Sequence, residues 1–146
     1  MSTRPLTTAD YPLAEQRPDL VAGPRGKRLD EITLAAILES QVTREDLAIS
    51  ATTLRHQADI ARAAGRPNLA ANFERAAELV AVPQEEIMRV YELLRPGRAA
   101  SKDELLATAR ALRIAWRANL IADYVEEAAE VYERRGLFRL SREPTP

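Results

Sequence analysis

The sequence predicts an all-α protein: a small helical domain over residues 29 to 140, built of five to six short helices, preceded by an extended N-terminal arm. Apolar residues recur at the three- and four-residue spacing of amphipathic helices through most of that domain. No stretch alternates apolar and polar residues as a half-buried strand would. Glycines and prolines fall between the periodic stretches, where helices begin and end. A length of 146 residues suits one domain.

The arm, residues 1 to 28, contains four prolines and two glycines and has little apolar periodicity, so no long helix is expected there. We expect residues 1 to 9 to be disordered. From Tyr11 to Val21 prolines alternate with apolar residues. That pattern suits an extended arm that lies on another surface.

A short helix is predicted near residues 33 to 40. One apolar side of it is formed by Leu34, Ile37 and Leu38. Residues 43 to 46 are predicted to form a turn. After this turn, Leu47 and Ile49 are expected to pin the linker to the core.

Three amphipathic helices are predicted in the middle of the chain. Ser50 can cap a helix from about Thr52 to Ala64, and Gly65 suits the left-handed residue that ends one. Pro67 and Pro83 can open the next two helices, because an N–H at the first position would have no partner in the helix. Their apolar stripes consist of Leu69, Phe73, Ala76 and Val80, and then of Ile87, Tyr91 and Leu94. Such short connections predict helices that fold back on each other and share one core.

Two further helices are predicted towards the C-terminus. Ser101 and Glu104 have the spacing of a capping box. The helix after them has one face made of Leu105, Ala109, Leu112 and Trp116. The last helix runs from about Leu120 to Arg135, and Gly136 closes it. Its inward side chains are predicted to be Ile121, Val125, Ala128, Val131 and Tyr132. Residues 141 to 146 are expected to be a flexible tail.

Composition excludes several classes of protein. The chain has no cysteine, which excludes disulfides and thiolate metal sites. Its net charge is −1, with acids and bases intermixed, so the basic face of a nucleic-acid binder is missing. No apolar run is long enough to span a membrane, and the N-terminus lacks the apolar core of a secretory signal. We therefore expect a cytoplasmic protein that binds neither nucleic acid nor membrane.

No catalytic, cofactor-binding or metal-binding residue is predicted. His56 is the only histidine, and neither a positioned nucleophile nor further ligands accompany it in the sequence. It also lies outside the Asp-x-His-x-x-Gly pattern by which some cobalamin proteins bind cobalt. An acidic cluster on the last helix is interpreted as a solvated or partner-facing surface rather than a metal site: Asp123, Glu126, Glu127, Glu130 and Glu133.

Three residues are predicted to contact a partner protein. Tyr11 and Trp116 are aromatic, and aromatic residues are enriched at interfaces. Arg17 is the third, because arginine is suited to bidentate contacts with carboxylates across an interface.

One stretch carries a family resemblance. The string AGRPNLAANFERAAELVAVP, residues 64 to 83, followed by IMRVYELLRP, residues 87 to 96, resembles the small subunit of adenosylcobalamin-dependent diol or glycerol dehydratases. Further matches, in the same order, are Tyr11–Leu13, Arg17–Val21, Gly26–Lys27, Leu29–Leu34 and Glu126–Leu137. The chain departs from the family at Ala51 and Thr52, where a proline and an acid are usual, so the helix after Ser50 is expected to start more weakly.

The resemblance implies a non-catalytic subunit that stabilises a large and a medium subunit, in a dimer of heterotrimers. Adenosylcobalamin would lie between those two subunits, and this chain alone would be inactive. The reaction implied is the radical dehydration of 1,2-propanediol to propanal, or of glycerol to 3-hydroxypropanal. Preference between the two substrates, and residence inside a bacterial microcompartment, stay open. The alternative is a free-standing helical interaction or targeting module for an enzyme assembly.

Overall fold

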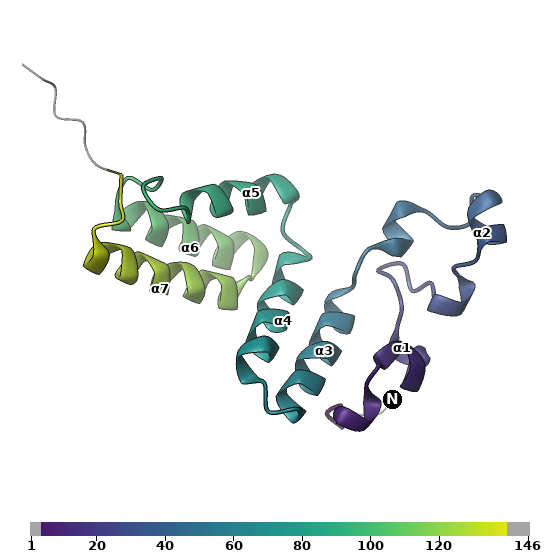
Figure 1. Cartoon of the computed structure of the whole chain (residues 1–146). Coiled ribbons are helices and arrows are strands. Elements are labelled where there is room, and N and C mark those ends of the chain that lie inside the picture. Colours follow the sequence, from purple (N-terminus) through teal and green to yellow (C-terminus); the bar gives the residue numbers. More distant parts are fainter. Residues whose placement is uncertain (1–3, 140–146) are drawn as a thin grey trace, which may run out of the picture. The chain divides into compact units, whose positions relative to one another are not determined.

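The computed structural model describes residues 4 to 139, and throughout this part of the chain it is all-α, as predicted (Figure 1). Its only β pairing there is an isolated bridge between Ala22 and Arg28. The chain divides into two compact units, one ending at Val80 and the other beginning at Ala81. The predicted tail, residues 141 to 146, lies outside the described residues. None of the described helices is long and apolar enough to cross a membrane.

The first unit is built on a helical hairpin of α3 (Ala51–Ala63) and α4 (Pro67–Leu79). Small side chains let the two helices approach closely; Ala58, Ala61 and Ala70 are buried between them, with Leu69 and Phe73 packed alongside. Gly65 has a φ of +70° and Pro67 is the first residue of α4, as predicted. Ser50 caps α3 by accepting a hydrogen bond from the Thr53 N–H at 3.1 Å, despite the departure from the family pattern.

The N-terminal segment packs on this hairpin. Disorder was expected for residues 1 to 9, but residues 4 to 9 are ordered. Leu6 and Leu13 are buried with Ile60 of α3. Three short helical turns interrupt the extended backbone: η1 (Thr8–Asp10), α1 (Leu13–Gln16) and η2 (Pro18–Leu20). The prolines exclude a long helix, but the leucines between them are enough to hold the segment against α3.

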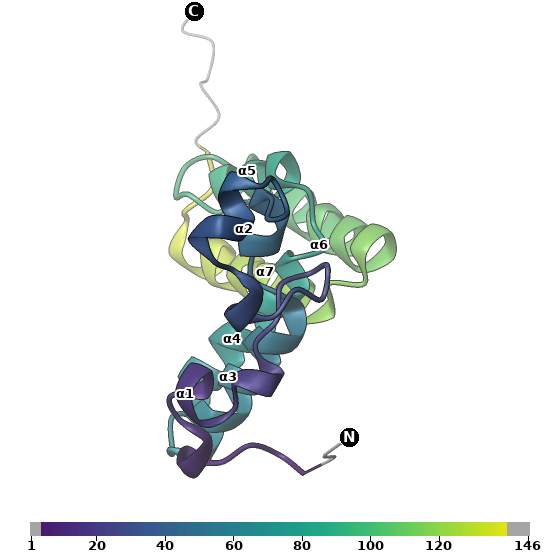
Figure 2. The same cartoon turned by 90° about the vertical axis from the view of Figure 1, so that its right-hand side faces the viewer.

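The rest of the first unit contains η3 (Leu29–Glu31), α2 (Leu34–Leu38) and η4 (Arg44–Leu47). Figures 1 and 2 show α2 at the end of this unit opposite to α1. Thr33 caps α2 by accepting from the Ala36 N–H at 3.2 Å. Leu47 and Ile49 are exposed, so the prediction that they pin the linker to the core is wrong.

The second unit contains α5 (Gln84–Leu93), α6 (Lys102–Trp116) and α7 (Asn119–Arg135). Helices α6 and α7 form a hairpin with a fully packed interior, made of Leu105, Ala109, Leu112, Ala122, Val125 and Ala129. Gly136 ends α7 in the left-handed conformation, as predicted. Tyr91 of α5 is exposed rather than inward. Of the three middle helices, for which the sequence predicts one shared core, α3 and α4 belong to the first unit and α5 to the second.

The start of α6 uses a variant of the predicted capping box. Ser101 Oγ accepts a hydrogen bond from the Glu104 N–H at 3.3 Å, as expected. The Glu104 carboxylate, however, accepts from the Ala100 N–H at 2.6 Å rather than from Ser101 itself. The Glu104 carboxylate thus lies near the N-terminus of α6, the positive end of the helix dipole, where a negative charge is favourable.

Candidate partner-binding surfaces

Tyr11 follows η1 and is 65% exposed. It lies at the edge of an apolar groove of about 450 Å³ between the N-terminal segment and the α3–α4 hairpin, whose walls include Ile60, Leu69 and Phe73. An exposed aromatic ring beside an apolar groove is an arrangement that protein interfaces favour. The prediction that Tyr11 contacts a partner remains a prediction.

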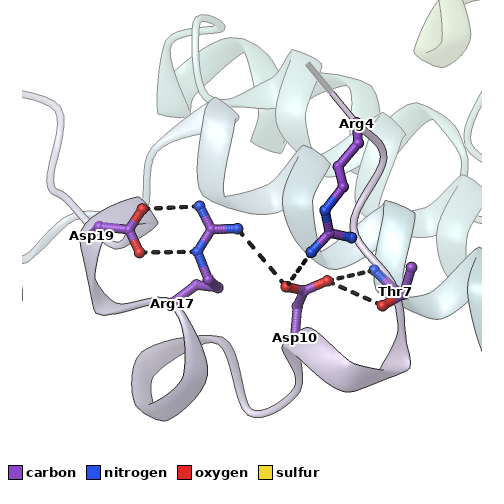
Figure 3. A network of polar contacts seen from close by, with 5 residues as sticks. All are labelled: Arg4, Thr7, Asp10, Arg17 and Asp19. Carbon is purple, nitrogen blue, oxygen red and sulfur yellow. Dashed lines mark hydrogen bonds and ion pairs between the residues drawn. The ribbon is translucent and has the colours of Figure 1, made fainter. Parts of the chain in front are cut away.

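Arg17 belongs to a network of charged side chains within the N-terminal segment (Figure 3). Its guanidinium donates to both carboxylate oxygens of Asp19, at 3.0 and 2.9 Å, and lies 3.8 Å from Asp10. Asp10 also accepts a hydrogen bond from Arg4 at 3.3 Å. The hydrogen bonds to Asp19 raise the pKa of Arg17. Arg17 therefore connects η1 and η2 through Asp10 and Asp19. The predicted contact of Arg17 with a partner stays a prediction, and the guanidinium would make that contact while it remains bonded to Asp19.

Asp10 is buried, and its burial is offset by hydrogen bonds from Thr7. The Thr7 backbone N–H and hydroxyl donate to one carboxylate oxygen at 2.8 and 3.1 Å. The backbone hydrogen bond is the main cause of the lowered pKa of Asp10. The carboxylate of Asp10, the last residue of η1, is thus held ionised by the residue that caps the start of η1.

The same device recurs at η4. Asp46 is buried and accepts from the N–H and hydroxyl of Thr43 at 2.8 and 3.1 Å, and from Arg25 Nε at 2.9 Å. The Thr43 backbone hydrogen bond is again the main cause of a lowered pKa. The sequence predicts a turn here, but the burial of Asp10 and Asp46 was not predicted. A shared Thr-x-x-Asp spacing, at residues 7 to 10 and 43 to 46, is the signal that identifies them.

Trp116 is the last residue of α6 and is 37% exposed. Arg117 follows in the left-handed conformation, with a φ of +53°, and turns the chain towards α7. Leu120, in the first turn of α7, is also exposed. The ring is therefore partly available to a partner, and the predicted contact remains a prediction.

His56 is partly buried on α3, and its Nδ1 has no hydrogen-bond partner. It lines a pocket of about 270 Å³ together with Arg4, Arg17 and Asp59. Across residues 4 to 139 no three His, Cys, Asp or Glu side chains are grouped so that they could hold a metal ion. The surroundings of His56 thus combine two cations and a carboxylate with the apolar side chains of Pro5, Leu6 and Leu20.

The acidic side chains of α7 bind basic residues of α6. Arg113 donates to Asp123 and to Glu126, the latter at 2.7 Å. Lys102 lies 2.8 Å from both Glu130 and Glu133. Hydrogen bonds to Glu126 raise the pKa of Arg113. Four of the five clustered carboxylates thus connect the two helices of the hairpin, which the sequence interpretation as a solvated or partner-facing surface did not anticipate.

Six exposed aliphatic side chains lie in a part of the chain where no functional residue was predicted. We call residues 29 to 49 the uncovered segment. Its exposed aliphatic residues are Leu29, Leu34, Ile37, Leu38, Leu47 and Ile49. Periodicity alone did not distinguish them from core residues, because it shows that apolar residues share a face and not what covers that face.

Comparison with known proteins gives consistent matches. A family model described as "Dehydratase small subunit" matches residues 6 to 139. Two curated relatives, the propanediol dehydratase small subunits of Citrobacter freundii and Salmonella typhimurium, are each 46% identical to this chain over 134 residues. The aligned part is 92% of this chain and 77% of each relative.

Proposed function

This chain belongs to the dehydratase small-subunit family, and from this premise we propose that it acts as the non-catalytic small subunit of a propanediol dehydratase, a lyase. Its partners are other subunits of that dehydratase. The observation that supports this role is the outward-facing apolar surface of the uncovered segment, together with exposed Tyr11. The largest apolar patch on a protein surface is often functional and marks a site that binds another protein.

The reaction we propose for the assembled enzyme is dehydration of 1,2-propanediol to propanal, with glycerol as the alternative substrate. Adenosylcobalamin would supply the radical, and a large and a medium subunit would hold it. We assign no part of the cofactor site to this chain, whose single histidine, His56, lies partly buried on α3. We therefore assign to it a role in binding and stabilising the other subunits.

Stabilisation follows from mass action. A subunit that binds only the folded form of its partners shifts their folding equilibrium towards that form. The expected contribution to turnover is therefore indirect: the complex should survive dilution and heat better with this chain than without it.

The test is to purify this chain alone, the remaining subunits alone, and the full complex, and to assay each with adenosylcobalamin and 1,2-propanediol. The isolated chain should be inactive, and the full complex should be the most active and the most resistant to dilution. Turnover by the isolated chain, or failure to bind the other subunits, would contradict the proposal. If the other subunits keep full activity and stability without it, the alternative of a targeting module, for example into a microcompartment, would be favoured.

A further inference from the structure

We infer that the uncovered segment is the principal docking surface of this chain, and that it binds an apolar surface with a basic rim on another subunit of the dehydratase. This inference rests on the proposed function, since the partner it names is a subunit of that complex. It goes further by assigning the contact to particular residues. None of Tyr11, Arg17 and Trp116 belongs to it.

Helix α2 buries too little of its own surface to be stable by itself. The helix has five residues, Leu34–Leu38, and buries only Ala36. Leu34 is 73% exposed and Leu38 is 77% exposed. A helix this short has little stability in water unless an apolar face packs against something. Nothing in the first unit covers those two leucines.

An apolar groove is lined by residues that come before and after α2 in the sequence. Leu29, Ile32, Leu47 and Ile49 line an apolar hollow of about 310 Å³. Lys27 lies at the same groove and donates from Nζ to the Gln41 carbonyl at 2.8 Å. The segment therefore offers both a protruding apolar helix and a recess that an apolar side chain of a partner can enter.

The exposed apolar patch is large enough to form the centre of a protein interface. Six aliphatic side chains that are about half to three-quarters exposed amount to an apolar patch on the order of several hundred Å², as large as the largest patch of a typical monomer. A standard interface buries about 800 Å² on each partner, and its centre is more apolar than its rim. The uncovered segment has the dimensions of such a centre.

The charge around the patch argues against a second copy of this chain as the occupant. The uncovered segment contains one basic residue, Arg44, and five acidic residues: Asp30, Glu31, Glu39, Glu45 and Asp46; Lys27 and Arg28 come directly before it. Asp30 is paired with Arg28, whereas Glu31 and Glu39 make no ion pair within the described chain. Two copies meeting here would place like charges opposite each other, which is costly, whereas a basic rim on a different subunit would be attracted.

The experiment uses the full chain and the other dehydratase subunits, with association measured by co-purification and by a titrated binding assay. The double variant Leu34→Glu/Leu38→Glu should lose association at least tenfold, while Leu34→Met/Leu38→Met should keep it. Both positions are exposed, so the isolated variants should keep the helix content and thermal midpoint of the wild type. Ile114→Glu is the matched control, because Ile114 is an aliphatic residue of α6 that is 82% exposed. It should bind normally.

A charge variant tests the rim. Glu39→Lys should weaken association several-fold at low salt, and the difference should shrink as salt is raised. Stronger association of Glu39→Lys would contradict the proposed basic rim.

The outcomes separate this inference from the proposed function. If the wild-type chain does not bind the other subunits, the proposed function fails. If it binds and the α2 double glutamate variant binds equally well, or if Ile114→Glu loses binding to the same extent, only the docking assignment is overturned. A self-association of the isolated wild-type chain that the glutamate variant abolishes would identify a second copy as the occupant and overturn it too.

Discussion

Large aliphatic side chains are buried in the α6–α7 hairpin but exposed in the uncovered segment. In the hairpin, Leu105 and Leu112 are completely buried and clustered charges connect the two helices. In the uncovered segment, leucines and isoleucines of the same size face outward, and its buried polar group is Asp46. The hairpin is complete by itself. The segment has its turns fixed by hydrogen bonds but lacks a core of its own, which is what a surface completed by another subunit needs.

The two regions should differ most in the free energy of unfolding that is lost when a leucine is replaced by alanine. Leu105→Ala removes a fully buried side chain and should lower the free energy of unfolding by about 2–5 kcal/mol. Leu38→Ala, in α2, should change it by no more than about 0.5 kcal/mol, because an exposed side chain loses little burial. Urea unfolding of the isolated chain measures both. A large loss for Leu38→Ala would mean that α2 is covered within the chain.

The next effect tests how the turns of the uncovered segment are fixed. A Cβ at Gly23 would lie 2.4 Å from the Asp46 carbonyl oxygen, so Gly23→Ala must displace backbone and should cost about 1–3 kcal/mol of local stability. Gly26→Ala is the control: it meets no atom within 4 Å, and only its positive φ of +81° is strained, at about 1 kcal/mol. Hydrogen exchange of the amides of Gly23 and Gly26, which donate to the Lys27 and Gly23 carbonyls, measures both. An equal or larger loss for Gly26→Ala would show that the close contact does not matter.

A smaller effect is expected in the second unit. The Tyr132 hydroxyl of α7 donates to the Leu94 carbonyl at the end of α5. Tyr132→Phe removes this bond and should lower the free energy of unfolding by about 1 kcal/mol. Tyr91→Phe serves as a comparison, because Tyr91 of α5 is exposed and lies in the same unit. If both variants unfold at the same urea concentration as the wild type, the Tyr132 bond contributes nothing measurable.

The smallest effect is one of pH. Because Thr43 lowers the pKa of Asp46, the folded state holds this carboxylate ionised to lower pH than the unfolded chain does. The stabilisation is therefore fully present above the ordinary carboxyl pKa of about 4 and is lost as pH falls through the lower value of the folded state. The NMR chemical shift of the Thr43 amide, which donates to the Asp46 carboxylate, should follow this titration. Asp46→Asn should abolish the titration, and an unchanged profile in that variant would contradict the assignment.

Much of this fold can be predicted from sequence, because long helices carry strong periodicity and clear end signals. The predicted helix from Leu120 to Arg135 differs from α7 by one residue, and Ser50, Gly65 and Gly136 have the roles expected of them. The family was identified from the stretch around residues 64 to 83, and the family model confirms it.

What the sequence could not supply is which apolar faces are covered. Leu47, Ile49 and Tyr91 have the residue types and spacing of core positions, yet all three are exposed. Burial depends on which elements meet in space, and for a subunit part of the covering surface belongs to another chain. The buried Asp10 and Asp46 were missed for the converse reason: a carboxylate is expected outside unless its partners are known.

Hydrogen exchange of the wild-type chain, alone and in the assembled dehydratase, tests the central claim most directly. Amides of residues 29 to 49 should exchange rapidly in the isolated chain and slowly in the complex, whereas those of α6 and α7 should exchange slowly in both. Slow exchange of residues 29 to 49 in the isolated chain, or rapid exchange that persists in the complex, would contradict the claim that another subunit completes this surface.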